Sequence, residues 1–258
     1  RENPADTLGI ARAGGAGPLV RLLRDTKLPS VKAYALLSLS LAIDEANQSV
    51  VAEEGGIEPL VGLLRLPDVT TCEQAACAVQ RLALNNADTQ KQITKHGAVE
   101  PLIALLDSTS TSRSQEYAAA ALAQLGTVRV GQLAISLGGG IAPLVNLLCD
   151  RHRYPEAKQY AAASLTRLAA ETKKEQDKRK EMSEKGETPP ASTAERIAEA
   201  GAIEPLVHLL SGEKGPEAQE EAAGALTALA IYASNRVAIS EFGGIGPLVV
   251  LLGSPNAK

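Results

Sequence analysis

The sequence has almost no aromatic side chains. It contains no tryptophan, Phe242 is the one phenylalanine, and aromatic residues make up 2% of its 258 residues. Strands favour aromatic and β-branched residues, whereas the alanine and leucine that dominate here favour helices. The composition therefore predicts an all-α protein with closely packed helices.

The sequence also lacks an excess of charge and any long apolar run. Its 26 basic and 30 acidic residues give a net charge of -4, which offers nothing for non-specific nucleic-acid binding. No apolar run approaches the ~20 residues that span a bilayer, and no signal peptide opens the chain. We therefore expect no nucleic-acid partner and no membrane partner within this segment.

Cysteine is scarce as well. Cys72, Cys77 and Cys149 are the three cysteines, an odd number without the spacing of metal ligands. They are best interpreted as free thiols in a reducing compartment, which favours the cytoplasm or the nucleus.

What the sequence does have is one string that recurs six times. The string reads Gly-(Gly/Ala)-x-x-Pro-Leu-(Val/Ile)-x-Leu-Leu, as in residues 55–64. Its prolines recur at intervals of 41, 42, 42, 62 and 42 residues, at Pro18, Pro59, Pro101, Pro143, Pro205 and Pro247. A period near 42 lies in the range of the HEAT and armadillo classes of helical repeats.

Each part of the string has a physical role. We expect its first glycine to end one helix in the left-handed conformation and its proline to lie in the first turn of the next helix. An aliphatic residue eight positions before each proline, such as Val51, predicts a short first helix. A longer third helix follows each Leu-Leu, with small residues that allow close helix packing. Thr71 and Gln74 resemble a capping box at the start of one third helix, and Pro155 and Pro216 suit a first helical position.

Three helices per unit, with this glycine–proline junction, resemble armadillo repeats, whereas HEAT repeats have two helices and no such junction. The chain is also similar to vacuolar-protein-8-like multi-repeat scaffolds. The resemblance implies an all-α, right-handed superhelical solenoid of three-helix armadillo repeats. We place its repeats at residues 1–44, 45–86, 87–127, 128–190, 191–232 and, as a partial repeat, 233–258. The start and end of this pattern suggest a piece of a longer array whose ends could associate with each other.

In armadillo proteins the third helices line a concave groove that binds peptides, so the resemblance implies a protein or peptide partner there. In the nuclear-import adaptors of the family, each third helix carries a Trp and, four residues later, an Asn that holds the peptide backbone. The Trp positions correspond to Tyr34, Cys77, Ala120, Ala163 and Gly224, and the Asn positions to Ser38, Arg81, Gln124, Arg167 and Ala228. Neither residue type is retained, so the sequence does not support an import-adaptor function.

A different set of side chains occupies the expected groove. Arg81, Gln124 and Arg167 are expected to stack along it about 10 Å apart, with Tyr117 and Tyr160 side by side one turn earlier. Arginine binds carboxylates through two parallel hydrogen bonds, and arginine and tyrosine often dominate interface energies. One hypothesis is that repeats two to four bind an acidic segment, and the alternative is that these are ordinary solvated polar groups. The predicted partner-binding residues are Tyr34, Ser38, Cys77, Arg81, Tyr117, Gln124, Tyr160 and Arg167.

The 62-residue interval contains an insertion of about 20 residues, near 171–193. Its first part is dense in both charges, and Gly186, Pro189 and Pro190 follow. One interpretation is a solvated extension of the fourth repeat's third helix plus a loop. The other is a partner-specific or regulatory arm beside the groove.

No signature of an enzyme stands out. His96, His152 and His208 are too far apart in the repeat frame to form one metal site or catalytic triad, and the glycine pairs lack the residues of a phosphate-binding loop. We therefore expect a binding scaffold with no catalytic, metal-binding or cofactor-binding residues. The alternatives are a transport adaptor for basic peptides, and the targeting or regulatory part of a larger enzyme.

Overall fold

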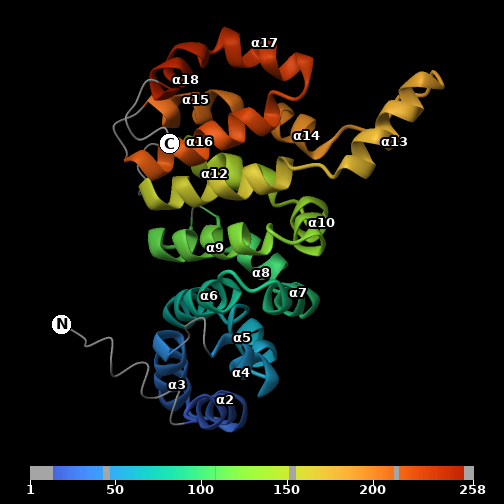
Figure 1. Cartoon of the computed structure of the whole chain (residues 1–258). Coiled ribbons are helices and arrows are strands. Elements are labelled where there is room, and N and C mark those ends of the chain that lie inside the picture. Colours follow the sequence, from blue (N-terminus) through green and yellow to red (C-terminus); the bar gives the residue numbers. More distant parts are fainter. Residues whose placement is uncertain (1–13, 43–46, 108, 151–154, 212–214, 253–258) are drawn as a thin grey trace. The chain divides into compact units, whose positions relative to one another are not determined.

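The structure is a computed structural model that describes residues 14–42, 47–107, 109–150, 155–211 and 215–252. Every regular element in these ranges is an α-helix (Figure 1), as the sequence predicts. Internal contacts divide the chain into two compact units, residues 1–138 (unit 1) and 139–258 (unit 2).

Unit 1 repeats the expected order of a short, a middle and a long helix. The long third helices are α3 (Pro29–Ala42), α6 (Val69–Ala83) and α9 (Ser112–Leu125). The middle helices are α2 (Ala16–Asp25), α5 (Ile57–Leu63) and α8 (Val99–Ala104), and the short first helices are α4 (Gln48–Glu53), α7 (Ala87–Lys95) and α10 (Arg129–Leu137). The third helices pack in sequence order, α3 on α6 and α6 on α9.

Unit 2 follows the same order and adds one helix. Its third helices, α12 (Pro155–Ala169) and α16 (Pro216–Leu229), pack against each other. The remaining elements are α11 (Ile141–Cys149), α13 (Lys173–Glu184), α14 (Thr193–Glu199), α15 (Ile203–Ser211), α17 (Ala233–Glu241) and α18 (Ile245–Leu252). The predictions that Pro155 and Pro216 begin helices are confirmed.

The core of each unit consists of leucines from the middle and third helices. The leucine after the junction proline is fully buried in four successive repeats, at Leu60, Leu102, Leu144 and Leu206. Alanines of the third helices are equally buried, as at Ala76 on α6, and their small volume lets adjacent third helices pack closely. The sparse aromatic content is thus matched by a core of aliphatic side chains.

The junction string has the predicted conformation. Gly55 has a φ of 78°, in the left-handed region that favours glycine. Positive φ values recur at the equivalent Gly14, Gly97, Gly139, Gly201 and Gly243. Each junction proline is the third residue of its helix, within the first turn, where a missing N–H does not interrupt the hydrogen bonding.

Polar side chains of the first helices bind the C-terminal carbonyl groups of the third helices. The Gln48 side chain donates to the carbonyls of Arg81 and Leu84 at 2.9 and 2.8 Å. In unit 2 an Arg236 nitrogen donates to the carbonyls of Ala230 and Ile231 at 2.9 and 3.0 Å. Since these carbonyls have no partner within their own helix, such bonds fix where each third helix ends.

One local prediction was wrong. Thr71 does not cap α6, because the helix begins earlier, at Val69, with Asp68 as its N-cap. The Thr71 backbone N–H donates to an Asp68 carboxylate oxygen at 2.7 Å. The Thr71 hydrogen bonds lower the pKa of Asp68, because they favour its charged form.

The interpretation of the insertion as an extension of the preceding third helix is wrong. Helix α12 ends at Ala169, and α13 begins independently at Lys173 with Thr172 as N-cap. Thr172 and Glu175 form a capping box, each side chain bonding the other residue's backbone N–H. A separately capped helix is free to change direction, and Figure 1 shows α13 projecting from the other helices of unit 2.

Candidate functional site

The expected groove residues of unit 1 lie at matching positions of adjacent helices. Ser38 on α3, Arg81 on α6 and Gln124 on α9 are each half-buried. Because α3 packs on α6 and α6 on α9, these three side chains form a row, which we call the unit 1 row. Their role in binding a partner stays a prediction.

Within unit 1, Tyr117 of α9 and Cys77 of α6 are brought together. Burial and the neighbouring Cys77 thiol raise the pKa of Tyr117. Cys77 is itself buried and precedes Arg81 by one turn of α6. Tyr117 therefore lies beside the unit 1 row, and Cys77, its neighbour, is too buried to offer much surface to a partner. Tyr34 is the most exposed of the predicted residues in this unit.

Arg167 has a different setting in unit 2. It is half-buried on α12, which packs against α16, the helix that carries Glu221. Burial raises the pKa of Glu221, and the positive charge of Arg167 opposes that rise. The Thr166 hydroxyl lies 3.3 Å from the Glu221 carbonyl oxygen, which places the two helices close together here. Arg167 thus helps to keep a partly buried carboxylate charged.

Two predicted arrangements join residues of different units. Tyr117 belongs to unit 1 and Tyr160, half-buried on α12, belongs to unit 2. The ladder of Arg81, Gln124 and Arg167 is divided in the same way. The side-by-side tyrosines and the continuous ladder therefore stay predictions.

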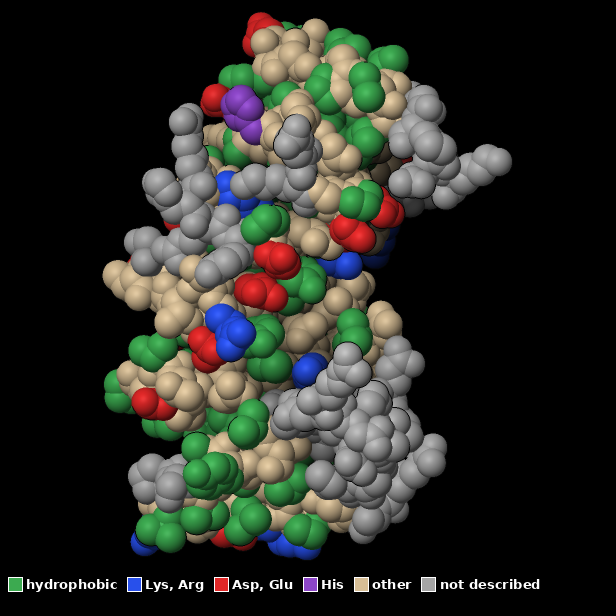
Figure 2. Space-filling model, turned by 90° about the vertical axis from the view of Figure 1, so that its left-hand side faces the viewer, with side chains coloured by type: hydrophobic (Ala, Val, Ile, Leu, Met, Phe, Trp, Pro, Cys, Tyr) green, Lys and Arg blue, Asp and Glu red, His purple; other side chains and the backbone are tan. Residues whose placement is uncertain are grey.

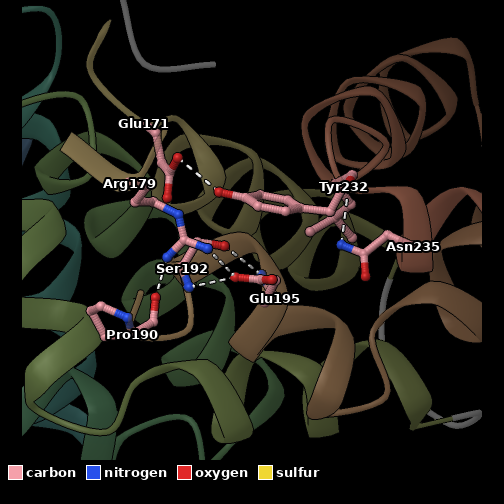
Figure 3. A network of polar contacts seen from close by, with 8 residues as sticks. Glu171, Arg179, Pro190, Ser192, Glu195, Tyr232 and Asn235 are labelled. Atoms are coloured by element: carbon pink, nitrogen blue, oxygen red, sulfur yellow. Dashed lines mark hydrogen bonds and ion pairs between the residues drawn. The ribbon is translucent and has the colours of Figure 1, made fainter. Parts of the chain in front are cut away.

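A second polar site, which the sequence reasoning missed, lies at the base of α13 (Figure 3). Arg179 forms an ion pair with Glu195 at 2.7 Å, and its side chain is only 18% exposed. It also donates to the carbonyl of Pro190 and lies over the ring of Tyr232, 5.4 Å from the ring centre. The Tyr232 hydroxyl in turn donates to Glu171 at 2.8 Å.

The Glu195 carboxylate of this network is stabilised in its charged form. Burial opposes ionisation of Glu195, but hydrogen bonds from Ser192 and the nearby Arg179 outweigh it and lower the pKa of Glu195. The Ser192 backbone N–H donates to Glu195 at 2.7 Å, as part of a capping box at the start of α14. The Ser-x-x-Glu pattern could have identified these two residues from the sequence.

A shallow cleft of about 330 Å³ opens beside this network. Its walls combine polar residues along α13 with apolar groups from the α16–α17 junction. They are lined by Glu171, Gln176, Arg179, Lys180, Ser183, Pro189, Ile231 and Tyr232. Ile231 is more than half exposed. The base of α13 is therefore an anchored structure with an accessible apolar side chain beside it.

Comparisons with known proteins agree with this architecture. The family model of the armadillo/beta-catenin-like repeat matches residues 44–84 and 193–231. A designed armadillo repeat protein superposes with a TM-score of 0.78 at 25% identity, over 93% of this chain and 93% of that one. The chain thus contains armadillo repeats, matched at residues 44–84 and 193–231, and has the fold of armadillo repeat proteins. The predicted three-helix armadillo fold is thereby confirmed.

Two further similarities are more limited in extent or in identity. Vacuolar protein 8 of Candida albicans is 37% identical over 86 residues, which are 33% of this chain and 14% of that protein. A designed armadillo repeat protein solved in complex with the peptide (KR)4 has a TM-score of 0.75 at 23% identity, covering 93% of each chain. The chain thus spans only a small part of the curated relative it matches.

This armadillo chain shows no cluster of metal-binding side chains within its described ranges, where no group of three or more His, Cys, Asp or Glu residues converges. His96 ends α7 in unit 1 and His208 lies on α15 in unit 2, while His152 falls outside the described residues. No single described helix is long and apolar enough to cross a membrane, although α10 and α11 taken together as a bent pair meet the length and hydropathy criteria.

Proposed function

We propose that this chain is a protein-interaction scaffold in which the third-helix face of unit 1 binds an extended partner segment through Arg81. The setting of Arg81 supports this proposal. Among the described residues, no carboxylate lies within ion-pair distance of its half-buried guanidinium group. A charged group held partly out of water gains from an anionic partner.

The neighbours of Arg81 favour an acidic peptide in an extended conformation. The guanidinium group supplies donors that match the two oxygens of a carboxylate. Ser38 and Gln124 continue the unit 1 row with neutral hydrogen-bonding groups, and Tyr117 adds an aromatic surface next to it. Alternating contacts of this kind along successive repeats suit a strand of peptide better than a compact ligand.

The armadillo fold does not by itself determine the charge of the ligand, since the designed armadillo protein in complex with (KR)4 binds a basic peptide. A transport adaptor would share that preference. Arg81 argues against it, because a lysine or arginine side chain placed beside a half-buried arginine would be repelled. The proposal assigns a binding role, in the cytoplasm or nucleus, and assigns no catalytic, metal-binding or cofactor-binding residue.

The test is fluorescence polarisation with two labelled peptides of equal length, (DE)4 and (KR)4. We expect the wild-type chain to prefer (DE)4, and Arg81→Glu to weaken this binding by about a hundredfold, as for a partly desolvated interface charge. Lys91→Glu is the matched control, since it makes the same charge change in unit 1 on the exposed face of α7. Its loss should stay below about threefold, in line with an exposed charge.

Three outcomes would contradict the proposal. A preference for (KR)4 would support the transport-adaptor alternative. Equal losses in Arg81→Glu and Lys91→Glu would mean that only the overall charge matters. Unchanged (DE)4 binding by Arg81→Glu would remove Arg81 from the site.

A further inference from the structure

The outer face of α10 in unit 1 carries a row of exposed apolar side chains, which we call the α10 stripe. Val130 is 45%, Leu133 is 44% and Leu137 is 79% exposed. Their spacing of three and four residues places them on one side of the helix, one turn apart. Single exposed apolar side chains are common on proteins, and Figure 2 shows them scattered among charged ones on the side of the molecule that faces left in Figure 1. An aligned set on one helix is a different feature.

The same positions of the other first helices in unit 1 are polar or charged. One repeat earlier, on α7, they are Asp88, Lys91 and Lys95, and all three are exposed. Two repeats earlier, on α4, the exposed Glu53 takes the place of Leu137. The outward orientation of these positions therefore belongs to the repeat itself, and α10 differs from α4 and α7 in making this face apolar.

Charged side chains of α7 flank the α10 stripe, because α7 packs beside α10. Lys91 forms an ion pair with Asp88 at 3.1 Å, yet the Asp88 side chain is still 85% exposed and accessible to a second cation. Lys95, two turns further along α7, has no carboxylate at ion-pair distance among the described residues. The outer face of α7 therefore has an accessible negative group near its start and an accessible positive group at its end.

We propose that the α10 stripe is the centre of a symmetric contact between two copies of this chain. The two α10 helices run antiparallel about a two-fold axis near Leu133, so that Val130 of one copy packs against Leu137 of the other. The same axis sets the two α7 helices antiparallel to each other, with Asp88 of one copy facing Lys95 of the other. The occupant is a second copy because this chain carries both the apolar stripe and the flanking charges that complement it.

Charge also favours the antiparallel arrangement over a parallel one. Arg129 begins α10, where the helix dipole makes a positive charge unfavourable. In the antiparallel pair each Arg129 lies near the C-terminal carbonyl groups of the other copy's α10, which attract it. A parallel pair would instead bring the two Arg129 side chains together. Because each copy uses the same surface, the contact closes at the dimer, and it does not involve Arg81 on α6.

Sedimentation equilibrium over a range of concentrations tests this proposal. We expect a monomer–dimer equilibrium that Leu133→Glu weakens by about tenfold or more, because it would bury a charge in the apolar contact. Val237→Glu is the matched control and should leave the dimer unchanged. Val237 is 57% exposed at the same repeat position on α17 of unit 2, where Ser234 and Glu241 stand at the other two positions. Both substituted residues are exposed, so circular dichroism should show unchanged helix content.

Exchange of the two charges on α7 tests the antiparallel arrangement. Lys95→Glu should weaken the dimer by about fivefold, since it places two carboxylates at each charged contact. Addition of Asp88→Lys to this variant should restore the dimer, because each contact again joins opposite charges. Failure of this rescue would contradict the antiparallel arrangement.

Three other results would overturn the proposal. The first is a wild-type chain that stays monomeric at every concentration, which is also the result expected if the α10 stripe binds an unrelated helix or a lipid surface instead. The second is equal weakening by Leu133→Glu and Val237→Glu, which would mean that any exposed apolar residue contributes. The third is the growth of assemblies larger than dimers, which a contact of two identical surfaces does not produce.

Discussion

Arg81 in unit 1 and Arg167 in unit 2 occupy the same position of their repeats, yet their surroundings differ. Arg81 stands in a row with the neutral Ser38 and Gln124 and has no described carboxylate at ion-pair distance. Arg167 acts on the partly buried Glu221 of the neighbouring third helix. Equivalent residues in a repeat protein therefore need not share a role, because the side chain on the next helix decides what each charge does.

The two units also differ in whether an additional helix interrupts the repeat. In unit 2 the extra helix α13 is attached through Arg179, which forms an ion pair with Glu195 and lies over the ring of Tyr232. In unit 1 the repeats follow each other without an added helix in the described ranges. The binding role of α13 stays a prediction, but its attachment is a specific, breakable feature of unit 2.

Removal of Arg179 should give the largest difference between the units. Arg179→Ala takes away an ion pair, a carbonyl hydrogen bond and a stacked ring at a site with little solvent, so we expect a loss of about 2 kcal/mol in the stability of unit 2. Hydrogen exchange should show α13 and α14 losing protection while α6 keeps it. Lys178→Ala, at an exposed position one residue earlier, is the control. Equal loss of protection in both variants would show that the network does not hold the helix.

Neutral substitution of the two equivalent arginines should separate stability from binding. Arg167→Gln leaves Glu221 without its opposing charge, and we expect a loss of about 1 kcal/mol, reduced by the remaining solvent access. Arg81→Gln should change stability by less than about 0.5 kcal/mol, as for a residue without an intramolecular partner. Urea unfolding of both variants provides the comparison. A larger loss for Arg81→Gln would reverse the roles assigned here.

The smallest effect concerns pH, where two carboxylates of unit 2 should respond in opposite directions. The folded-state pKa of Glu221 is raised above its usual 4.5, mainly by burial, so its contribution is present at lower pH and is lost as pH rises through the folded value. Glu195 has a lowered folded-state pKa despite its burial, because Ser192 and Arg179 favour the charged form. Its contribution is present above 4.5 and is lost as pH falls.

Thermal unfolding of two glutamine variants at several pH values checks these signs. Relative to wild type, Glu221→Gln should become more favourable as pH rises from acid to neutral, whereas Glu195→Gln should become less favourable over the same range. Parallel pH profiles for the two variants would contradict the assignment of burial as the dominant influence on the pKa of Glu221.

The sequence predicted those features of the fold that depend on local chemistry. The left-handed glycines, the prolines in the first turn and the long third helices follow from short-range backbone preferences repeated six times. The start of α6 was misplaced because Asp68 competes with Thr71 for the cap and binds the Thr71 N–H. The separate α13 was missed because Thr172 and Glu175 were taken as part of one continuous charged helix.

The candidate site was only partly predictable for a different reason. Repeat spacing assigned Ser38, Arg81 and Gln124 to equivalent positions of their repeats, and the structure shows each of them half-buried. It could not show that Glu221, 54 residues after Arg167, would face it, because that contact depends on how α12 and α16 pack. Nor could it single out Arg179 among a run of surface charges, since only the folded chain brings Tyr232 and Glu195 to it.

The most direct test of the central claim is the NMR signal of the Arg81 Nε–H group in the 15N-labelled chain, recorded as (DE)4 is added. Arg81→Lys and Arg167→Lys assign the two arginine signals. We expect the Arg81 signal to shift on binding, since its guanidinium group gains a carboxylate partner, while the Arg167 signal stays near its starting position beside Glu221. A shift of the Arg167 signal with no change at Arg81 would contradict the proposed binding site.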